Sequence, residues 1–384
     1  MIAIKYKKIY DEFVKQYEEI HINPWHQISH QKLNTLYENI INSMDITDEY
    51  SFKYLMDYLI KRLSGSEDAH TKYQCIDAIP LNFRKFNDEI LVNYPNNLKG
   101  FNLIAINGIS IHEIINQLED VITYGTVGKR NYEIEKSLFN RMTMFELESF
   151  RNTNELIYEL ADNSGNIVKK KITKNEKYDN LFDYDNYFYG NNAEYKVIDN
   201  CLIYNHSSIQ DKFKCLIENS IKKLEAEDLS HVDTIIIDLR GNCGGNAALN
   251  KILVNYLKKQ SNKKLLCLSD YRVFSGGRYA LNDLINLKAT TIGEEISTPI
   301  NCYGNSHWCT IDNHHFSISE CYFHPFIGIS ASSKKEFNKK ITKQVKIPYI
   351  FHPDIEVHQT KEDYLNNIDT ILNYALKYSK TLKK

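Results

Sequence analysis

Hydrophobic residues recur at steps of three and four along the chain up to Gly65. This spacing places them on one face of a helix, and it predicts helices over residues 6–20, 33–41 and 52–63. Asp48 precedes the third segment at the position of a helix N-cap. We therefore expect a helical N-terminal domain over residues 1–66.

The pattern changes after Asp68 to short apolar runs separated by Asn, Gly and Pro, which predicts strands and turns. The pair Asn107-Gly108 is typical of a tight hairpin turn, and a helix is expected just after it. Strands are expected on either side of a turn at 163–166, and a polar, tyrosine-rich stretch at 175–192 is expected to form a connection or flap. Residues 67–190 are thus predicted to form a β-rich region.

The remaining residues, 191–384, combine helical and buried-strand patterns. Helical periodicity extends over 209–229 and 248–259, while the run IIIDL at 235–239 suits a strand buried on both faces. A second apolar run follows at 265–269. Short strands and turns are expected from Gly293 to Phe351, and one helix from about Glu362. This order indicates an α/β core.

Composition and charge exclude several classes of protein. The chain has 384 residues, 42% of them apolar and 25% charged, as in a globular protein of two or three domains. Its 47 basic and 49 acidic residues nearly cancel, which argues against nucleic acid as a partner. No apolar run is long enough to span a membrane, and no signal peptide is legible at the charged N-terminus, so we expect a cytoplasmic protein.

The sequence offers no pattern for a metal or a cofactor. Its eight cysteines are scattered without CxxC pairs, so we expect reduced thiols and no metal site. Neither the phosphate-binding GxxxxGKS/T pattern nor the dinucleotide pattern GxGxxG occurs, and no cofactor is predicted. Any chemistry is therefore expected from the side chains and backbone of the protein itself.

Two glycine-rich turns carry the candidate chemistry. GNCGG at 241–245 follows the buried strand, where its N–H groups either face an anion or simply form a tight turn. Ser275 begins the turn SGGR before an amphipathic stretch, where its hydroxyl is either a nucleophile or a helix cap. A serine nucleophile needs a base. His70, in SEDAHTKY, is the first candidate, and the reserve candidates are His206, His324 and His352.

Taken together, these motifs resemble those of the C-terminal processing, or tail-specific, serine peptidases. DTIIIDLRGNCGG is similar to the buried strand and Asn-x-Gly-Gly loop of that family, and VFSGG to its nucleophile turn. Downstream, ATTIGEEISTPINCYGN and HPDIEVHQTKEDYLNNID resemble the glycine-glutamate strand and the Pro-Asp segment. Upstream, DAHT resembles an element of the branch related to the tricorn core protease, and FNLIAINGIS a PDZ-like module. The resemblance covers about Asp68 to Tyr378.

The resemblance implies a fold and a set of roles. The fold would be α/β, a crotonase-like (ClpP/crotonase) ββα core with a reduced PDZ-like module beside the helical N-terminal domain. Ser275 would attack the scissile carbonyl and His70 would act as general base. The backbone N–H of Gly276, with that of Gly245 or Gly244, would hold the oxyanion.

A third catalytic residue is also implied by the resemblance. One branch of the family uses a lysine base, but the corresponding place here, residues 297–299, reads Ser-Thr-Pro, which favours His70. The tricorn-like branch has an orienting glutamate before its Pro-Asp segment. KIPYIFHPD has no carboxylate before its own Pro-Asp pair, so Glu294 and Glu295 are the candidates for this role.

Three functions are compatible with these patterns. The first hypothesis is a serine endopeptidase that cuts peptides or unfolded protein tails through an acyl-enzyme. The second is a catalytically inactive peptide- or ligand-binding protein on the same scaffold, suggested by the SGGR turn and the missing glutamate. The third, a crotonase-like acyl-CoA enzyme, does not explain Ser275 or DAHT. Relatives in the family are often exported, and self-association into a homo-oligomer is left open.

Overall fold

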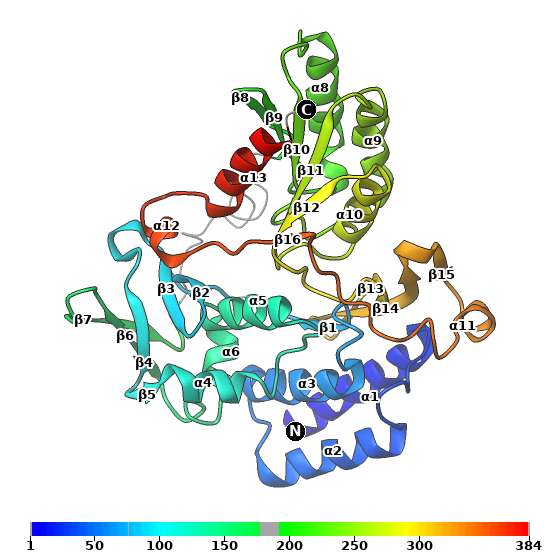
Figure 1. The fold of residues 1–384 in the computed structure, drawn as a ribbon. Coiled ribbons are helices and arrows are strands. Elements are labelled where there is room, and N and C mark those ends of the chain that lie inside the picture. The colour runs from blue at the N-terminus through cyan, green and yellow to red at the C-terminus, as the bar shows by residue number, and fades with distance from the viewer. Residues whose placement is uncertain (1, 76, 177–191, 383–384) are drawn as a thin grey trace. The chain divides into compact units, whose positions relative to one another are not determined.

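The computed structural model describes residues 2–75, 77–176 and 192–382, which form a mixed α/β protein with several sheets (Figure 1). Two compact units can be distinguished, and both are discontinuous in sequence. As far as these ranges are described, the first unit comprises Met1–Phe182, Asn301–His324 and Ile329–Pro348, and the second Asp183–Ile300, Pro325–Gly328 and Tyr349–Lys384. Residues 177–191, most of the predicted tyrosine-rich flap, lie outside the described residues.

Three helices begin the first unit: α1 (Ile2–Ile20), α2 (His30–Ser43) and α3 (Glu49–Ser64). Asp48 caps α3 in a capping box, because its side chain accepts the N–H of Ser51 while the Ser51 hydroxyl accepts the N–H of Asp48. The apolar faces of the helices share one core with Phe316 and Ile318. The predicted helices are therefore confirmed, and their core includes side chains from the last third of the chain.

A small antiparallel sheet completes this core. It contains β1 (Lys72–Gln74), β13 (Cys302–Ile311), β14 (His314–His324) and β15 (Ile329–Ala331), and the helix α11 (Lys334–Lys340) follows it. β13 pairs with β14, and Lys72 of β1 pairs with Ser317 of β14. The prediction of only short strands after Gly293 is wrong here, because Asp312 and Asn313 turn a long hairpin at positive φ without a glycine.

The second sheet of this unit has the strand order β2-β3-β4-β6-β7, with β5 paired to β4. Its strands are β2 (Asn82–Phe86), β3 (Glu89–Tyr94), β4 (Asn102–Ile106), β5 (Ile109–Ser110), β6 (Glu155–Ala161) and β7 (Ile167–Thr173), accompanied by α4 (Ile111–Leu118), α5 (Val127–Leu138) and α6 (Arg141–Glu146). Asn107 and Gly108 both have positive φ, as the predicted hairpin turn between β4 and β5 requires.

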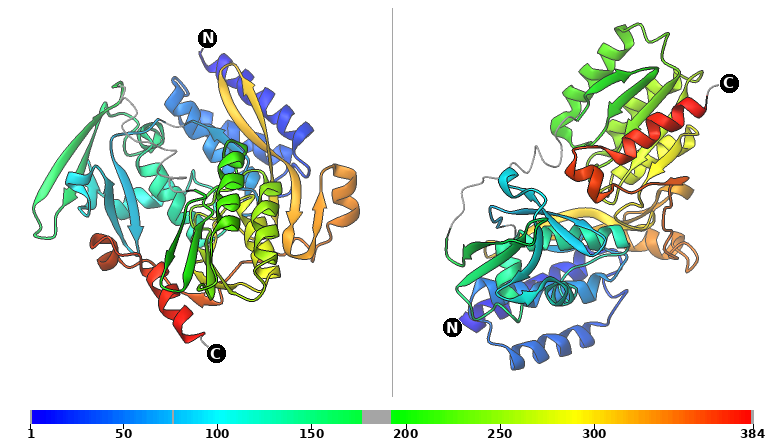
Figure 2. Two further views of the ribbon diagram at one scale, coloured as in Figure 1. Left: turned by 90° about the horizontal axis from the view of Figure 1, so that it is seen from above. Right: turned by 60° about the vertical axis from the view of Figure 1, so that its left-hand side comes forward.

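The second unit is built on a six-stranded sheet of order β16-β12-β11-β10-β9-β8, parallel except at β8 (Figure 1). The strands are β8 (Tyr195–Ile198), β9 (Cys201–Asn205), β10 (Thr234–Asp238), β11 (Lys264–Ser269), β12 (Thr290–Gly293) and β16 (Ile355–Glu356). Helices cover both faces: α8 (Lys214–Ala226), α9 (Asn250–Lys258) and α10 (Gly277–Asn286) on one, α13 (Thr370–Thr381) on the other (Figure 2).

Burial on both faces explains the continuous apolar run in β10. Ile235 and Ile237 belong to the core under α8 to α10, whereas Ile236 belongs to the core under α13. Alternate side chains of a strand point to opposite faces, so a strand covered twice needs apolar residues throughout. The predicted buried strand is confirmed.

Two helix predictions need correction. The single C-terminal helix is instead α12 (Lys361–Leu365) and α13, separated by a turn in which Asn367 has a φ of 57°. The helix expected from residue 209 starts later, because η2 (Asp211–Phe213) precedes α8, and η3 (Ala247–Leu249) likewise precedes α9. The remaining 3-10 turns are η1 (Asn96–Leu98) and η4 (Pro325–Ile327). Among the described helices, none has the length and apolarity required to cross a bilayer.

Candidate active site

Ser275 lies in the second unit, in the turn between β11 and α10. Its φ is 48°, in the left-handed region that a residue with a Cβ rarely adopts. Such backbone strain costs about 1–3 kcal/mol and persists only where surrounding structure imposes it. The half-buried Ser275 is therefore held in an uncommon conformation at the start of a helix.

The glycine loop 241–245 packs directly against this turn. The loop follows β10 and the Ser275 turn follows β11, and these two strands are parallel neighbours, so both loops leave the same edge of the sheet. A Cβ added to Gly244 would lie 2.6 Å from the nitrogen of Gly276 and 2.8 Å from Cβ of Ser275. Gly244 also has a φ of 103°. The close approach and the backbone conformation both require glycine there.

The approach is equally close from the side of the Ser275 turn. A Cβ on Gly277 would lie 2.5 Å from the carbonyl oxygen of Asn242, and one on Gly276 would lie 2.7 Å from the carbonyl oxygen of Gly245. The unusual Gly276-Gly277 pair in SGGR is thus explained by contact with the glycine loop. Glycine inside a helix start costs about 1 kcal/mol in helix propensity, and here it permits the two loops to meet.

The backbone N–H groups of these two loops differ in whether they donate a hydrogen bond within the protein. The N–H of Gly244 donates to Oδ1 of Asn242 at 3.0 Å, and the N–H of Gly277 donates to the carbonyl of Phe274 at 2.8 Å. Within the described residues, no hydrogen bond is found that uses the N–H of Gly276 or of Gly245. Gly245 is exposed, and its nitrogen would lie 3.1 Å from a Cβ on Gly276. The two glycines thus lie against each other, and Gly276 is buried whereas Gly245 is exposed.

Buried polar side chains hold the glycine loop in place. Asn242 is fully buried, and its Nδ2 donates to the carbonyl of His206 at 2.7 Å. Asp270, at the end of β11, accepts the N–H of Gly241 at 3.0 Å and pairs with Arg272. The loop is therefore anchored at both flanks by hydrogen bonds to neighbouring strand ends.

Arg278 fixes the turn at Ser275 from the inside of the unit. It is 1% exposed, the largest of the fully buried side chains among the described residues. Its Nε donates to the carbonyl of Ser275 at 3.1 Å, and one terminal nitrogen donates to the carbonyls of Ile300 at 2.8 Å and Pro299 at 3.4 Å. The guanidinium thus ties the strained turn to the segment that follows β12. Sequence reasoning missed this role because arginine is rarely buried.

His70 lies in the first unit, between α3 and β1. It is 7% exposed, and its Nδ1 lies 3.1 Å from the carbonyl oxygen of Tyr303. A carbonyl oxygen only accepts, so Nδ1 carries the hydrogen and, in the neutral ring, Nε2 carries the lone pair. A Cβ on Gly304 would approach Cε1 of His70 to 3.2 Å, so the strand β13 closely supports the ring.

The structure therefore gathers the predicted site residues in two groups. Ser275, Gly276, Gly244 and Gly245 lie together in the second unit, whereas His70 belongs to the first.

The two candidate glutamates lie just after β12 in the second unit. Oε1 of Glu294 lies 3.5 Å from Nδ1 of His358 and accepts the N–H of Gln359 at 3.3 Å. The hydrogen bond that His358 donates to Glu294, with a second that it donates to Glu356, raises the pKa of His358 to about 9 despite the opposing effect of burial. Glu294 is thus engaged with the Pro-Asp segment, and Glu295 is half-buried beside it.

The reserve histidines differ from His70 in their settings. His206 is fully buried, its Nε2 lies 3.0 Å from Oδ1 of Asn250, and burial lowers its pKa to about 4. His324 is buried at the end of β14, and His352 is exposed. His206 lies against the glycine loop through its backbone, and it supports Asn242 there.

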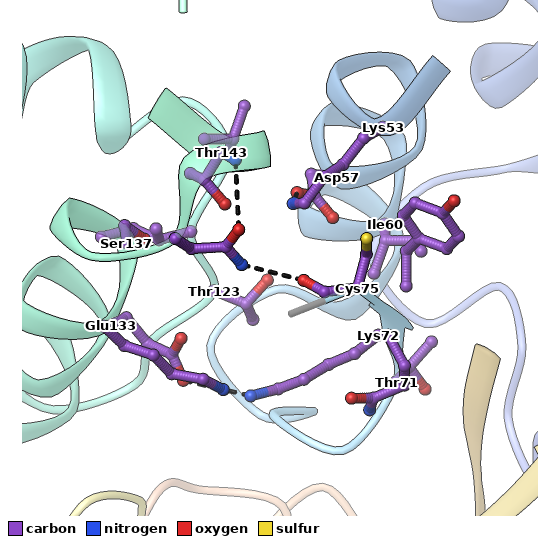
Figure 3. Close-up of a pocket in the computed structure, with 16 residues that line it drawn as sticks. Lys53, Asp57, Ile60, Thr71, Lys72, Cys75, Thr123, Glu133, Ser137 and Thr143 are labelled. Atoms are coloured by element: carbon purple, nitrogen blue, oxygen red, sulfur yellow. Dashed lines mark hydrogen bonds and ion pairs between the residues drawn. The ribbon is translucent and has the colours of Figure 1, made fainter. Parts of the chain in front are cut away.

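A polar cavity of about 90 Å³ lies in the first unit beside β1 (Figure 3). Figure 3 shows Lys72 extended toward Glu133, 3.1 Å away, and Lys53 beside Asp57, with which it forms an ion pair. Thr71, next to His70 in the sequence, also lines it. These two lysines and two carboxylates are thus paired, which is the usual requirement for burying charges.

Comparison with known proteins identifies the architecture. No protein-family model matches the sequence, and no curated protein is significantly similar to it. Solved structures match over nearly the whole chain, so the fold is one that has been seen before. It is similar to mature CPAF complexed with lactacystin, with a TM-score of 0.68 and 8% identity over 99% of this chain and 98% of that one.

Two further solved structures are similar to this chain. Mature CPAF alone gives a TM-score of 0.65 and 9% identity over 98% and 96% of the two chains. The photosystem II D1 C-terminal processing protease gives 0.46 and 10% over 92% and 93%. At identities this low, what the CPAF structures share with this chain is the fold.

Proposed function

We propose that this protein is a serine endopeptidase of the C-terminal processing type, acting on peptides or unfolded protein tails. The observation that carries the proposal is the strained turn at Ser275, packed against a glycine loop at van der Waals limits. A helix cap does not require a left-handed serine or two adjoining glycine backbones. A nucleophile presented on a strained turn beside backbone oxyanion donors accounts for both features.

In the proposed reaction, Oγ of Ser275 attacks the scissile carbonyl carbon while Nε2 of His70 accepts the hydroxyl proton. The new oxyanion is held by the N–H groups of Gly276 and Gly245; Gly244 is the weaker candidate because its N–H already donates to Asn242. One such donor typically contributes about 3–4 kcal/mol to lowering the barrier. His70 then protonates the leaving amine, and a water molecule, deprotonated by His70, releases the acid product and restores Ser275.

The proposal requires the base and the nucleophile to meet. Proton transfer needs Nε2 of His70 within about 2.6–3.2 Å of Oγ of Ser275. We propose further that the second unit is the crotonase-like core and that the β2 to β7 sheet is the reduced PDZ-like module. We also propose that Glu294 or Glu295 has the orienting role in the site.

Hydrolysis of an unstructured peptide by wild type and Ser275→Ala tests the assignment. We expect Ser275→Ala to lose turnover while its circular dichroism is unchanged. The matched control is Ser379→Ala, a buried serine on α13 on the other face of the sheet, which should retain turnover. Equal turnover in Ser275→Ala and wild type would refute the proposal.

The second candidate is an inactive peptide-binding protein on the same scaffold. A fluorophosphonate probe separates it from the enzyme, because only an activated serine reacts. Labelling of wild type and of Ser379→Ala, but not of Ser275→Ala, supports the peptidase. Absence of labelling at every pH, together with retained binding of an unstructured peptide, supports the binding protein.

A further inference from the structure

A buried histidine–aspartate pair lies next to His70, whose backbone N–H donates to the aspartate. His21, just beyond the C-terminal end of α1, and Asp68, two residues before His70, are both 0% exposed. Nε2 of His21 lies 3.2 Å from Oδ2 of Asp68. Such a pair is costly to bury unless each partner is fully hydrogen-bonded.

The protonation of this pair follows from its neighbours. Nδ1 of His21 accepts the N–H of Asn23 at 3.0 Å, so the hydrogen of the neutral ring is on Nε2 and is donated to Asp68. Burial alone would raise the pKa of Asp68, but hydrogen bonds from His21, Ser319 and Thr71 hold it well below its usual range. Asp68 is therefore a fixed, buried negative charge.

The second oxygen of Asp68 holds the backbone of the base candidate. Oδ1 accepts the N–H of His70 at 3.1 Å, the N–H of Thr71 at 3.0 Å and the hydroxyl of Ser319 at 2.5 Å. The carbonyl of His70 accepts the hydroxyl of Ser317 at 2.6 Å. Both ends of this residue are thus fixed to side chains of the surrounding elements.

The acceptor of the His70 ring is fixed by the same segment after α1. The Tyr303 hydroxyl accepts Nδ2 of Asn23 at 2.9 Å, and the Tyr303 ring lies 5.0 Å from that of His21 and 4.4 Å from that of His26. The carbonyl of this immobilised tyrosine is the group that accepts Nδ1–H of His70. Backbone and ring of His70 are therefore positioned from one buried cluster.

We infer that Asp68 and His21 are positioning residues for His70, and that the Tyr303 carbonyl holds the His70 tautomer. The inference rests on the proposed function, in which His70 is the base. A carbonyl fixes the ring orientation and tautomer as a carboxylate would. Asp68 supplies the full negative charge nearby, at the backbone of His70 instead of at its ring.

Asp68→Asn and His21→Gln test the inference, with kcat and KM for an unstructured peptide as the readout and circular dichroism giving the folded fraction. In Asp68→Asn, the new amide N–H faces the Nε2–H of His21, so two donors meet and the hydrogen bond between the two side chains is lost. We expect kcat to fall about 10- to 100-fold with KM within about twofold, since a misplaced base slows chemistry and not binding.

The double variant His21→Gln/Asp68→Asn should recover much of the lost kcat, because the glutamine carbonyl can accept from the asparagine amide. Ser319→Ala, which removes one bond to Asp68, provides a milder test should Asp68→Asn fold poorly, and kcat should fall about 3- to 10-fold. Asp57→Asn is the matched control: this carboxylate is also largely buried in the first unit and pairs with Lys53, so its loss should affect stability and leave kcat unchanged.

His70→Ala separates the inference from the proposed function. If His70→Ala retains wild-type turnover, His70 is not the base and the proposed function fails. If His70→Ala is inactive but folded Asp68→Asn, His21→Gln and Ser319→Ala all keep wild-type kcat, the positioning role is overturned while the base stands. A loss in these variants without recovery in the double variant would also count against the paired role of His21.

Discussion

The buried guanidinium of Arg278 allows a quantitative test of the strain in the Ser275 turn. The left-handed conformation of Ser275 costs about 1–3 kcal/mol. A hydrogen bond from a charged group contributes about 1.5–3 kcal/mol, and Arg278 makes one to the carbonyl of Ser275 and others to Pro299 and Ile300. The first of these bonds is therefore about large enough to offset the strain.

Arg278→Met keeps much of the buried volume and removes all of these side-chain bonds. We expect the free energy of unfolding to fall by about 2–4 kcal/mol, because the carbonyls of Pro299 and Ile300 lose a donor. We also expect the turn to relax. A shift of about 1.4–3 kcal/mol against the strained conformation depletes it about 10- to 100-fold.

The assay is the rate of fluorophosphonate labelling of Ser275, measured beside a urea unfolding curve. Arg278→Met should label about 10- to 100-fold more slowly than wild type, and Arg278→Lys should resemble it because an ammonium cannot span the same carbonyls. Lys263→Met is the matched control: Lys263 donates to the carbonyls of Leu229 and Val232 just before β11, at the opposite end of that strand. It should lose stability and label normally.

Normal labelling of folded Arg278→Met would show that the turn keeps its conformation without the guanidinium. Equal slowing in Lys263→Met would show that general destabilisation, and not the local bond, controls the reactivity of Ser275. Either result would refute the reasoning from strain.

Three other predictions concern close contacts and a titrating group. Gly277→Ala should destabilise the protein by about 1–3 kcal/mol and slow labelling, since its Cβ would overlap a backbone oxygen at 2.5 Å. Gly304→Ala, which brings a Cβ to 3.2 Å from His70, should lower kcat with little change in the melting temperature. In the Pro-Asp segment, the pKa of His358 is raised to about 9 chiefly by Glu294, so the stabilising contribution of this histidine is complete below about pH 6.5 and lost as pH rises through 9. Melting curves of His358→Ala and wild type should therefore converge above that pH.

Local patterns predicted much of the fold because the spacing of apolar residues shows which face of a helix or strand is buried. The periodicity of α1 to α3 and the apolar run of β10 reflect which faces are buried, and each is legible within a few turns or residues. The long β13–β14 hairpin was not predicted, since Asp312 and Asn313 turn it without the glycine that usually marks such a turn. Asn367 likewise divides the last helix at a positive φ that propensity does not reveal.

The candidate site was predictable only in part, because local patterns do not show contacts between residues that are distant in sequence. The resemblance implied that Ser275 and the glycine loop would meet, and the structure gives the reason, because neighbouring parallel strands end at one edge of a sheet. Arg278, by contrast, would be assigned to the surface from its type alone. The pairing of His21 with Asp68 spans 47 positions of sequence, and nothing local to either residue indicates the other.

The tethering of His70 to β13 and β14 has a consequence for biosynthesis. Its carbonyl is bound by Ser317, and its ring by the carbonyl of Tyr303, residues more than 230 positions later in the chain. Chains are made from the N-terminus at about 5–20 residues per second, and contacts so distant in sequence form late. A growing polypeptide therefore carries Ser275 before it can assemble His70, and if the proposed chemistry holds, a ribosome-bound chain stays inert until the β13–β14 hairpin has emerged.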